Sequence, residues 1–325
     1  MRKELIANFA AALGDFRFAR SYETGLVFVM QIPSVLVVLF SVAGLAPVLA
    51  NAQGSPSWVD VGRILGSAPV ATGGYQRFSF PRKDLTVRVK DVTIGAALAL
   101  GSWAGFDGTV ERSEMMGDLV VTAAELPSVA RKLVENGLAI TAIHNHLLGE
   151  DPQIMYVHFH GHGSALDLAK RLDPVLAATG TPRPVQPAAS AALTIDTVLV
   201  FKRLGKSGRA SGSFAGVSLT LIRPVVKMAG MAVRPALGLA SPINLQMVDT
   251  VRAVATGDFA VLATEAPRLI ETLVRGGITP TAVHSHLIGE SPKVTYVHFW
   301  GDMPVGPLLD ALAAAIASTQ KQGSH

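Results

Sequence analysis

The chain contains an internal repeat, and no other feature of the sequence limits its fold as strongly. Residues 117–162 align with residues 257–302 at a constant offset of 140, with 22 identities in 46 positions and no gap. A period of this length is too long for a solenoid and indicates a duplicated domain. We therefore predict repeat domain 1 over residues 53–180, a proline-rich linker over 181–193, repeat domain 2 over 194–319 and a short tail over 320–325.

The residue pattern inside each copy predicts an α+β fold. In copy one the expected order is a strand at 119–122, a helix from Leu126 that ends at Gly137, strands at 139–148 and 154–160 and a closing helix at 166–178, with further strands upstream at 78–80, 85–89 and 97–103. Elements in this order form a sandwich with a mostly antiparallel sheet and helices on one face. We expect two tandem copies of this sandwich.

The composition excludes several classes of protein. The sequence has no cysteine, so a disulfide, a thiolate metal site and an iron–sulfur cluster are ruled out, and any transition metal must be held by His, Asp or Glu. The hydrophobic share of 49% fits a chain with a packed core. The formal net charge of +4 is spread without clusters of Lys or Arg, which argues against nucleic acid as a partner.

The N-terminal segment, residues 1–52, predicts export. Residues 25–50 form a stretch of 26 residues without a charge, preceded by Arg17 and Arg20. The stretch ends at Ala50-Asn51-Ala52, which fits the small-residue rule for signal-peptide cleavage. An uncleaved N-terminal anchor is the alternative, because the stretch is long enough to span a bilayer. Both interpretations predict a periplasmic or extracellular protein, with membrane contact only through this segment if it stays uncleaved.

Eight of the nine histidines lie in the two predicted hairpins. Side chains alternate along a strand, so His144, His146 and His158 are expected on one face of copy one. If the hairpin turns about residues 150–152, His144 lies opposite His158, with Cβ atoms about 5 Å apart. The other face is expected to be core, and it carries Ile143, Leu147, Met155, Val157 and Phe159.

Three imidazoles on one sheet face predict a site for a divalent transition metal, because neutral imidazole is a ligand for Zn, Cu, Fe or Ni. The candidate ligands are His144, His146, His158 and His160 in copy one and His284, His286 and His298 in copy two. Copy two has Trp300 at the position of His160. Within each set of three matching histidines, the ring nitrogens are expected within about 3–5 Å of each other, and three protein ligands leave an open coordination position.

Four acidic residues recur near these histidines. Glu150 and Glu290 each follow the second histidine by four residues, so each is a candidate fourth ligand or a base that activates metal-bound water. Asp118 and Asp258 also match between the copies, and we interpret them as turn residues.

The leading hypothesis is an exported metal-binding protein with one site of the H-x-H...H type in each repeat. One alternative is a metal-dependent hydrolase that uses Glu150 or Glu290 as its base. The other is a non-catalytic envelope binding module whose histidines contact an organic ligand or a partner. The sequence contains no motif for a serine nucleophile or a nucleotide site.

Three sequence motifs resemble the LppY/LpqO-type family of exported bacterial proteins. They are Leu98-Ala99-Leu100-Gly101-Ser102-Trp103, Thr141-Ala142-Ile143-His144-Asn145-His146-Leu147 and Tyr156-Val157-His158-Phe159-His160-Gly161-His162-Gly163, the last two with counterparts in residues 281–288 and 296–301. The resemblance spans nearly all of the chain after the leader. It implies export and a duplicated domain, and it brings no settled activity. The namesake members look like lipoproteins, and this chain, which has no cysteine, departs from them in that respect.

Overall fold

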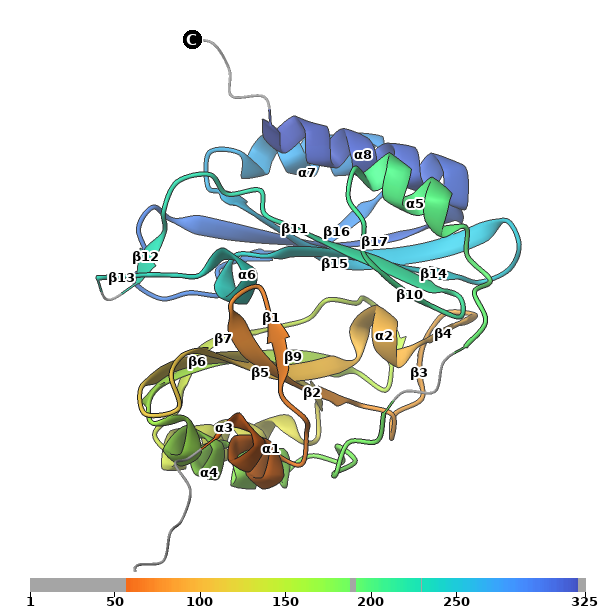
Figure 1. Cartoon of the computed structure of the whole chain (residues 1–325). Coiled ribbons are helices and arrows are strands. Elements are labelled where there is room, and N and C mark those ends of the chain that lie inside the picture. Colours follow the sequence, from red (N-terminus) through yellow and green to blue (C-terminus); the bar gives the residue numbers. More distant parts are fainter. Residues whose placement is uncertain (1–56, 188–190, 229, 321–325) are drawn as a thin grey trace, which may run out of the picture. The chain divides into compact units, whose positions relative to one another are not determined.

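The computed structural model describes residues 57–187, 191–228 and 230–320 (Figure 1). The predicted leader, part of the predicted linker and nearly all of the predicted tail lie outside the described residues. Within the described ranges, no helix is both long and apolar enough to cross a membrane.

Copy one is built on a six-stranded antiparallel sheet in the order β1-β2-β5-β6-β9-β7. Its strands are β1 (Val70–Thr72), β2 (Tyr75–Pro81), β5 (Gly101–Gly108), β6 (Ser113–Thr122), β7 (Ala139–His144) and β9 (Ile154–Gly163). A small second sheet contains β3 (Val87–Val89), β4 (Val92–Ile94) and β8 (Glu150–Asp151). The helices are α1 (Trp58–Leu65), α2 (Ala96–Ala99), α3 (Leu126–Glu135) and α4 (Ala165–Leu176).

Copy two repeats this arrangement in its six-stranded sheet, in the order β10-β11-β14-β15-β17-β16. Its strands are β10 (Arg209–Ser211), β11 (Phe214–Leu219), β14 (Ser241–Met247), β15 (Arg252–Leu262), β16 (Thr279–His284) and β17 (Val294–Pro304). The remaining elements are the pair β12 (Lys227–Met228) and β13 (Met231–Ala232) and the helices α5 (Thr197–Leu204), α6 (Pro235–Gly238), α7 (Ala266–Arg275) and α8 (Val305–Gln320). The predicted α+β fold in two tandem copies is confirmed.

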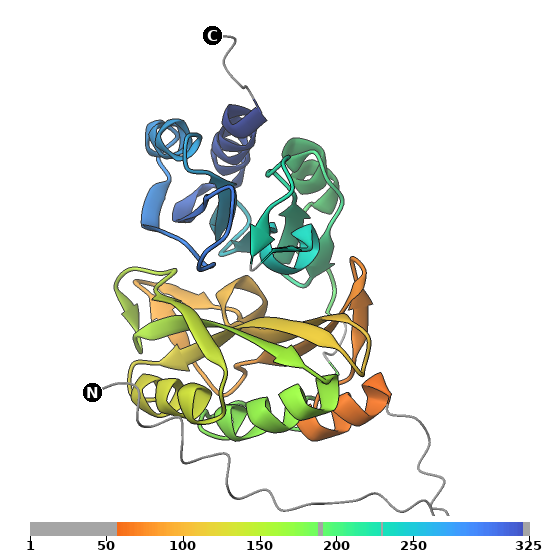
Figure 2. The ribbon, with the colours of Figure 1, turned by 90° about the vertical axis from the view of Figure 1, so that its left-hand side faces the viewer.

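Three helices cover one face of each large sheet, as the sequence predicted. In copy one, α1, α3 and α4 lie on the same side of the sheet (Figure 2; α1 orange, α4 green). Helix α3 buries Val129 and Leu133, which are four residues apart and therefore share one face of the helix. They join Phe78, Phe106 and Phe159 in the core of copy one. Burial of each such side chain contributes about 1.5–3 kcal/mol to stability.

Both copies belong to one compact unit, Gly54–His325. They contact each other on the sides of the two sheets opposite the three large helices. Asn244 on β14 donates a hydrogen bond of 3.0 Å to the backbone oxygen of Leu98. Gln246 on the same strand accepts one of 2.8 Å from the Gly95 N–H. The ion pair between Arg252 and Asp91, at 2.6 Å, adds a further link. The ring centroids of His144 and His284 lie 4.1 Å apart, so the histidine-bearing faces of the two hairpins also meet in this interface.

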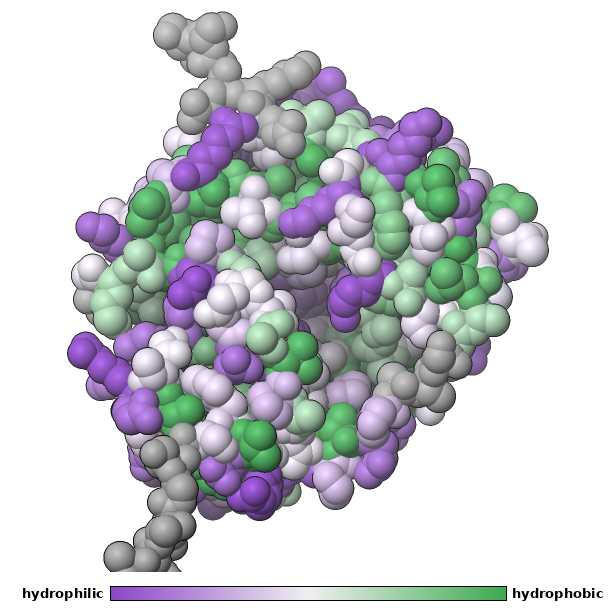
Figure 3. All heavy atoms as spheres, in the orientation of Figure 1, coloured by the Kyte–Doolittle hydropathy of each residue, from purple (hydrophilic) through white to green (hydrophobic). Residues whose placement is uncertain are grey.

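The outer surface mixes charged and apolar side chains without one continuous patch of either kind on the face that Figure 3 shows. Several large apolar side chains are nevertheless exposed at the edge strands. Ile143 on β7 is 45% exposed and Val283, its counterpart on β16, is 52% exposed. The prediction that Ile143 belongs to the core is wrong, because β7 is the last strand of its sheet.

The predicted hairpin register is also wrong. His144 lies opposite Tyr156, and His158 lies opposite Ala142. Strand β7 ends at His144, so His146 lies in the loop that follows and not in the strand. The upstream strand predicted at 97–103 begins at Gly101, because Ala96–Ala99 forms the short helix α2.

Candidate metal centre

Six histidines come from matching places in the two copies. We call His144, His146 and His158 the copy-one triad and His284, His286 and His298 the copy-two triad. In each triad the first histidine ends an edge strand, the second lies two residues further in the loop, and the third lies within the strand beside the edge strand. The ring of the loop histidine stays close to that of the first histidine, at 5.0 Å in copy one and 4.9 Å in copy two.

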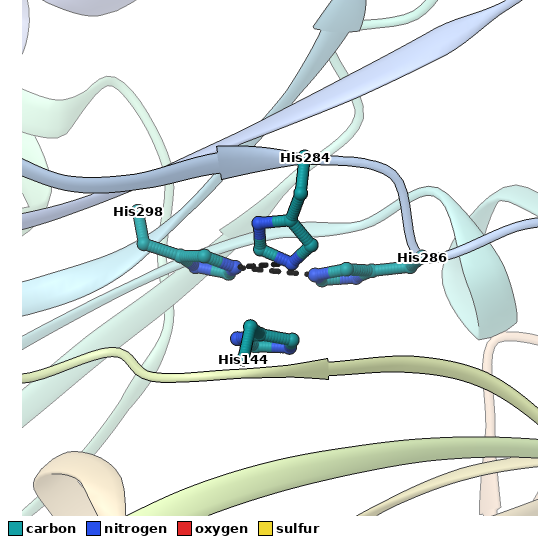
Figure 4. Close-up of side chains that lie close together, drawn as sticks. All are labelled: His144, His284, His286 and His298. Atoms are coloured by element: carbon teal, nitrogen blue, oxygen red, sulfur yellow. Dashed lines mark hydrogen bonds between the residues drawn. The ribbon is translucent and has the colours of Figure 1, made fainter.

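In the copy-two triad, three ring nitrogens converge. The Nε2 atoms of His286 and His298 lie 3.1 Å apart, and those of His298 and His284 lie 3.3 Å apart. Figure 4 shows the three rings directed toward one point, with His144 of copy one beside them. A tetrahedral zinc ion with ligand bonds of 2.0–2.1 Å places its nitrogens about 3.3 Å apart. The expected approach of the nitrogens is confirmed for copy two.

Asp258 fixes the orientation of His298. The Oδ1 atom of Asp258, on the neighbouring strand β15, lies 2.8 Å from His298 Nδ1. With a proton on Nδ1 donated to this carboxylate, Nε2 carries a lone pair that faces the other two histidines. The same oxygen lies 3.4 Å from Nδ1 of His146, in the other copy. The carboxylate of Asp258 therefore holds His298 by a hydrogen bond and lies near an imidazole of the other copy.

In the copy-one triad, two ring-centroid distances match those of copy two, but its three histidines do not form a group with all ligand atoms within 4.8 Å among the described residues. His144 lies 5.0 Å from His146 and 5.0 Å from His158, compared with 4.9 Å and 4.8 Å for the matching pairs of copy two. The Nε2 atoms of all three rings are buried and have no hydrogen-bond partner among the described residues. His158 Nε2 lies 3.8 Å from Asp118 Oδ2, which is too long for a hydrogen bond.

Two groups of potential metal ligands have all their ligand atoms within 4.8 Å of one another, and both groups combine the copies. The first is His144, His284, His286 and His298, and the second is His146, Asp258 and His298. The ring centroids of His144 and His284 are 4.1 Å apart. This arrangement differs from the expected separate site in each repeat, because the two sheets present their histidine faces to each other.

Burial controls the charges at this centre. It lowers the pKa of His144, His146, His158 and His286 well below 6.5, and the neighbouring histidines lower these pKa values further. Burial also lowers the pKa of His284 to about 4. These imidazoles are therefore neutral at pH 7, which is the form that binds metals. Burial and the nearby Asp258 carboxylate raise the pKa of Asp118 to about 8.

Sequence reasoning missed four residues of the centre. Asp118 and Asp258 do not lie in turns, because each lies within a central strand directly opposite the third histidine of its triad. Tyr156 and Tyr296 lie against the loop histidines, with ring centroids 3.9 Å from His146 and 3.7 Å from His286, respectively. The signal that could have found the tyrosines is Tyr-x-His, which both copies contain.

Four predicted site residues lie outside both groups of converging ligand atoms, namely His158, His160, Glu150 and Glu290. His160 pairs with Glu114, with 2.8 Å between Nε2 and Oε2. Glu150 accepts a hydrogen bond of 3.1 Å from the Ile154 N–H, and Glu290 accepts the equivalent bond of 3.3 Å from Val294. Both glutamates therefore stabilise the turn of their hairpin.

The chain matches the family model described as Domain of Unknown Function (DUF1259) twice, at residues 59–178 and 199–318. The two matches cover more than half of the chain and correspond to the two copies. The chain therefore belongs to this family, with a duplicated domain. No curated protein matches the sequence.

Solved structures with some likeness to the chain include the regulatory subunit of aspartate kinase from Thermus flavus, at 13% identity and a TM-score of 0.20 over 66% of this chain and 95% of that chain. The same subunit from Thermus thermophilus, in ligand-free form, has 14% identity and a TM-score of 0.20 over 68% and 98% of the two chains. EtuB from Clostridium kluyveri has 13% identity and a TM-score of 0.20 over 78% and 90%. At these TM-scores the likenesses carry no argument about fold or function.

Proposed function

We propose that this protein binds a divalent transition metal ion through the Nε2 atoms of His284, His286 and His298, with His144 as the fourth ligand. The observation that carries the proposal is the convergence of the copy-two nitrogens at 3.1 and 3.3 Å. Hydrogen bonding alone does not account for it. With its Nδ1 proton donated to Asp258, His298 has one lone pair on Nε2, which can accept a single N–H, yet two imidazole nitrogens face it. A cation at this point is a partner for all three.

The chemistry of the ligands limits the metal. Neutral imidazoles without thiolates suit Zn, Cu, Ni or Fe better than Mg or Ca, which prefer oxygen ligands. Asp258 behind His298 is the outer carboxylate that metal-bound histidines commonly have. We further propose that the protein acts outside the cytoplasm. The uncharged stretch of residues 25–50 and the resemblance to LppY/LpqO-type exported proteins support this.

The test is metal analysis of the full chain, purified without a His tag, followed by calorimetric titration of the metal-free protein with Zn²⁺. We expect bound metal after purification and tight, saturable binding in the titration. His286→Ala should weaken binding of this ion strongly, because His286 supplies one of the three converging nitrogens. His160→Ala is the matched control and should bind as the parent protein does. A protein that takes up no transition metal at neutral pH would contradict the proposal.

A further inference from the structure

We propose that the metal ion is a structural clasp between the two copies. Four protein nitrogens close its coordination shell, and its binding stabilises the docked arrangement of the copies. This inference rests on the proposed function and gives the bound ion a role. It places the centre among closed structural metal sites, and it argues against the hydrolase alternative, which needs an open position for water.

The number of ligands carries the first step. The ligand atoms of His144, His284, His286 and His298 all lie within 4.8 Å of one another, and Figure 4 shows the ring of His144 beside the other three. Structural zinc sites have four protein ligands in a tetrahedron, whereas catalytic sites have three and keep one position for water or substrate. Copy two alone supplies three ligands. The fourth position is taken by a residue of the other copy.

The surroundings of the ligands leave no approach for a substrate of ordinary size. His298 is fully buried, and His286 and His144 are 6% and 7% exposed. Tyr296, which is itself 1% exposed, stacks on His286 with 3.7 Å between the ring centroids. Catalytic sites need a path for substrate and product, and structural sites do not. The burial of these ligands fits the structural class.

The polar groups next to the centre are engaged in holding the fold. The hydroxyl of Tyr156 donates a hydrogen bond of 2.8 Å to the backbone oxygen of Ala99, and the hydroxyl of Tyr296 donates to that of Gly238. The turn glutamates accept hydrogen bonds from backbone N–H groups. A general base must be within reach of the water that it activates. These four groups are bonded to the backbone instead.

His144 couples the ion to the docking of the copies. Its ring packs against three rings of copy two, with centroids 4.1 Å from His284, 5.0 Å from His286 and 4.6 Å from His298. Its Nε2 atom is buried and has no hydrogen-bond partner among the described residues. Separation of the copies would expose this nitrogen to water, so the cost of leaving it unpaired falls on the docked state alone. A metal ion removes that cost.

The other polar links between the copies are more exposed to solvent. In the ion pair of Arg252 and Asp91 the side chains are 31% and 62% exposed, and in that of Arg234 and Asp107 they are 40% and 24% exposed. Exposed ion pairs contribute little, because water and salt screen them. Val254 of copy two also packs in a buried apolar cluster of copy one, so the metal-free copies keep a contact. The ion adds a buried bond to these links.

Mass action sets the direction of the effect. The docked state offers the ion four nitrogens, and a separated copy two offers three. An ion that binds one state more tightly shifts the equilibrium toward that state. Metal therefore favours the docked state, and the contribution of His144 sets the size of the shift.

The first test uses Co²⁺, whose visible spectrum reports its coordination, as a probe of the shell. The full chain with one bound Co²⁺ should show the strong bands of a tetrahedral ion, and azide should leave them unchanged. His144→Ala opens one position, so azide should change the spectrum of this variant. A response to azide in the parent protein, or none in His144→Ala, would overturn the closed shell and leave metal binding standing. Failure of the parent to bind Co²⁺ and Zn²⁺ would sink the proposed function as well.

The second test measures docking by hydrogen exchange of the full chain with and without Zn²⁺. In the parent, Zn²⁺ should slow exchange in copy two and also in residues 95–101 and 139–144 of copy one. His144→Ala should keep the protection in copy two and lose that in copy one, and thermal melting checks its fold. His160→Ala is the matched control and should behave as the parent does. Bound Zn²⁺ that slows exchange in copy two alone would overturn the clasp, and the parent protein suffices for this outcome.

Discussion

The two copies carry the same histidine motif, and they differ in how firmly the third histidine is held. In copy two, His298 is fully buried and lies 2.8 Å from Asp258, and its Nε2 meets the nitrogens of its triad. In copy one, His158 lies 3.8 Å from Asp118 and makes no hydrogen bond to it. The difference shows that the motif alone does not form the site. The carboxylate of Asp258 holds the ring of His298 so that Nε2 faces the other two nitrogens, and on this ground we expect copy two to bind metal more tightly than copy one.

Replacing the third histidine of each triad should give the largest difference in metal affinity between the two copies. We expect His298→Ala to reduce affinity for the metal ion by more than about 100-fold, because loss of an outer partner alone costs 10–100-fold. His158→Ala should change this affinity much less. Calorimetric titration with Zn²⁺ measures both variants. Equal losses in the two variants would remove the proposed difference between the copies.

The next effect should come from the carboxylates. Asp258→Asn should weaken binding of the metal ion about 10–100-fold, since a neutral amide oxygen accepts the His298 N–H more weakly than the carboxylate does. Asp118→Asn should have a smaller effect on that ion, because Asp118 makes no hydrogen bond to the copy-two triad. Competition with a chelator of known affinity gives the two values. A stronger effect of Asp118→Asn would reverse our assignment of the orienting carboxylate.

The stability of the metal-free protein should depend on pH through the buried histidines. The folded pKa lies below the unfolded value near 6.5 for His144, His146, His158, His284 and His286, with His284 at about 4. Below pH 6.5 the unfolded chain therefore binds more protons than the folded chain, and the free energy of unfolding falls as pH is lowered. Each such histidine contributes about 1.4 kcal/mol per pH unit in this range. Urea unfolding at pH 7 and pH 5 in the presence of a chelator measures how the free energy of unfolding changes with pH. His146→Ala should reduce this change by the contribution of one histidine, about 1.4 kcal/mol per pH unit. An unchanged pH dependence would mean that His146 is not neutral in the fold.

The smallest expected difference between the copies is in the stability effect of the two turn glutamates, Glu290 and Glu150. Glu290 is 3% exposed and Glu150 is half-buried, so Glu290→Gln should cost about 1 kcal/mol of stability and Glu150→Gln less. Neither change should alter the metal content, because both carboxylates bond to the backbone of the turn. Chemical unfolding and metal analysis of the two variants check this. Loss of metal from Glu290→Gln would restore it as a candidate ligand.

The sequence predicted the fold and the histidines because both depend on local pattern. The offset of 140 identified the duplication, and the alternation of side chains grouped the histidines. The register of the hairpin could not be predicted in the same way, because β7 ends at His144 and the chain leaves the sheet there. The role of Asp258 depends on which strands are neighbours in the sheet. Strand β15 pairs with β17, and this places Asp258 beside His298, 40 residues later in the sequence. The meeting of the two triads depends on the docking of two domains, and no local pattern records it.

The central claim is that histidines from both copies form one metal centre. The most direct measurement is a crystal structure of the zinc-loaded full chain, with anomalous diffraction recorded at the zinc edge. We expect one peak at the Nε2 atoms of His284, His286 and His298, within bonding distance of His144 from copy one. Peaks confined to surface residues such as His162, or the absence of any peak between the two sheets, would contradict the account.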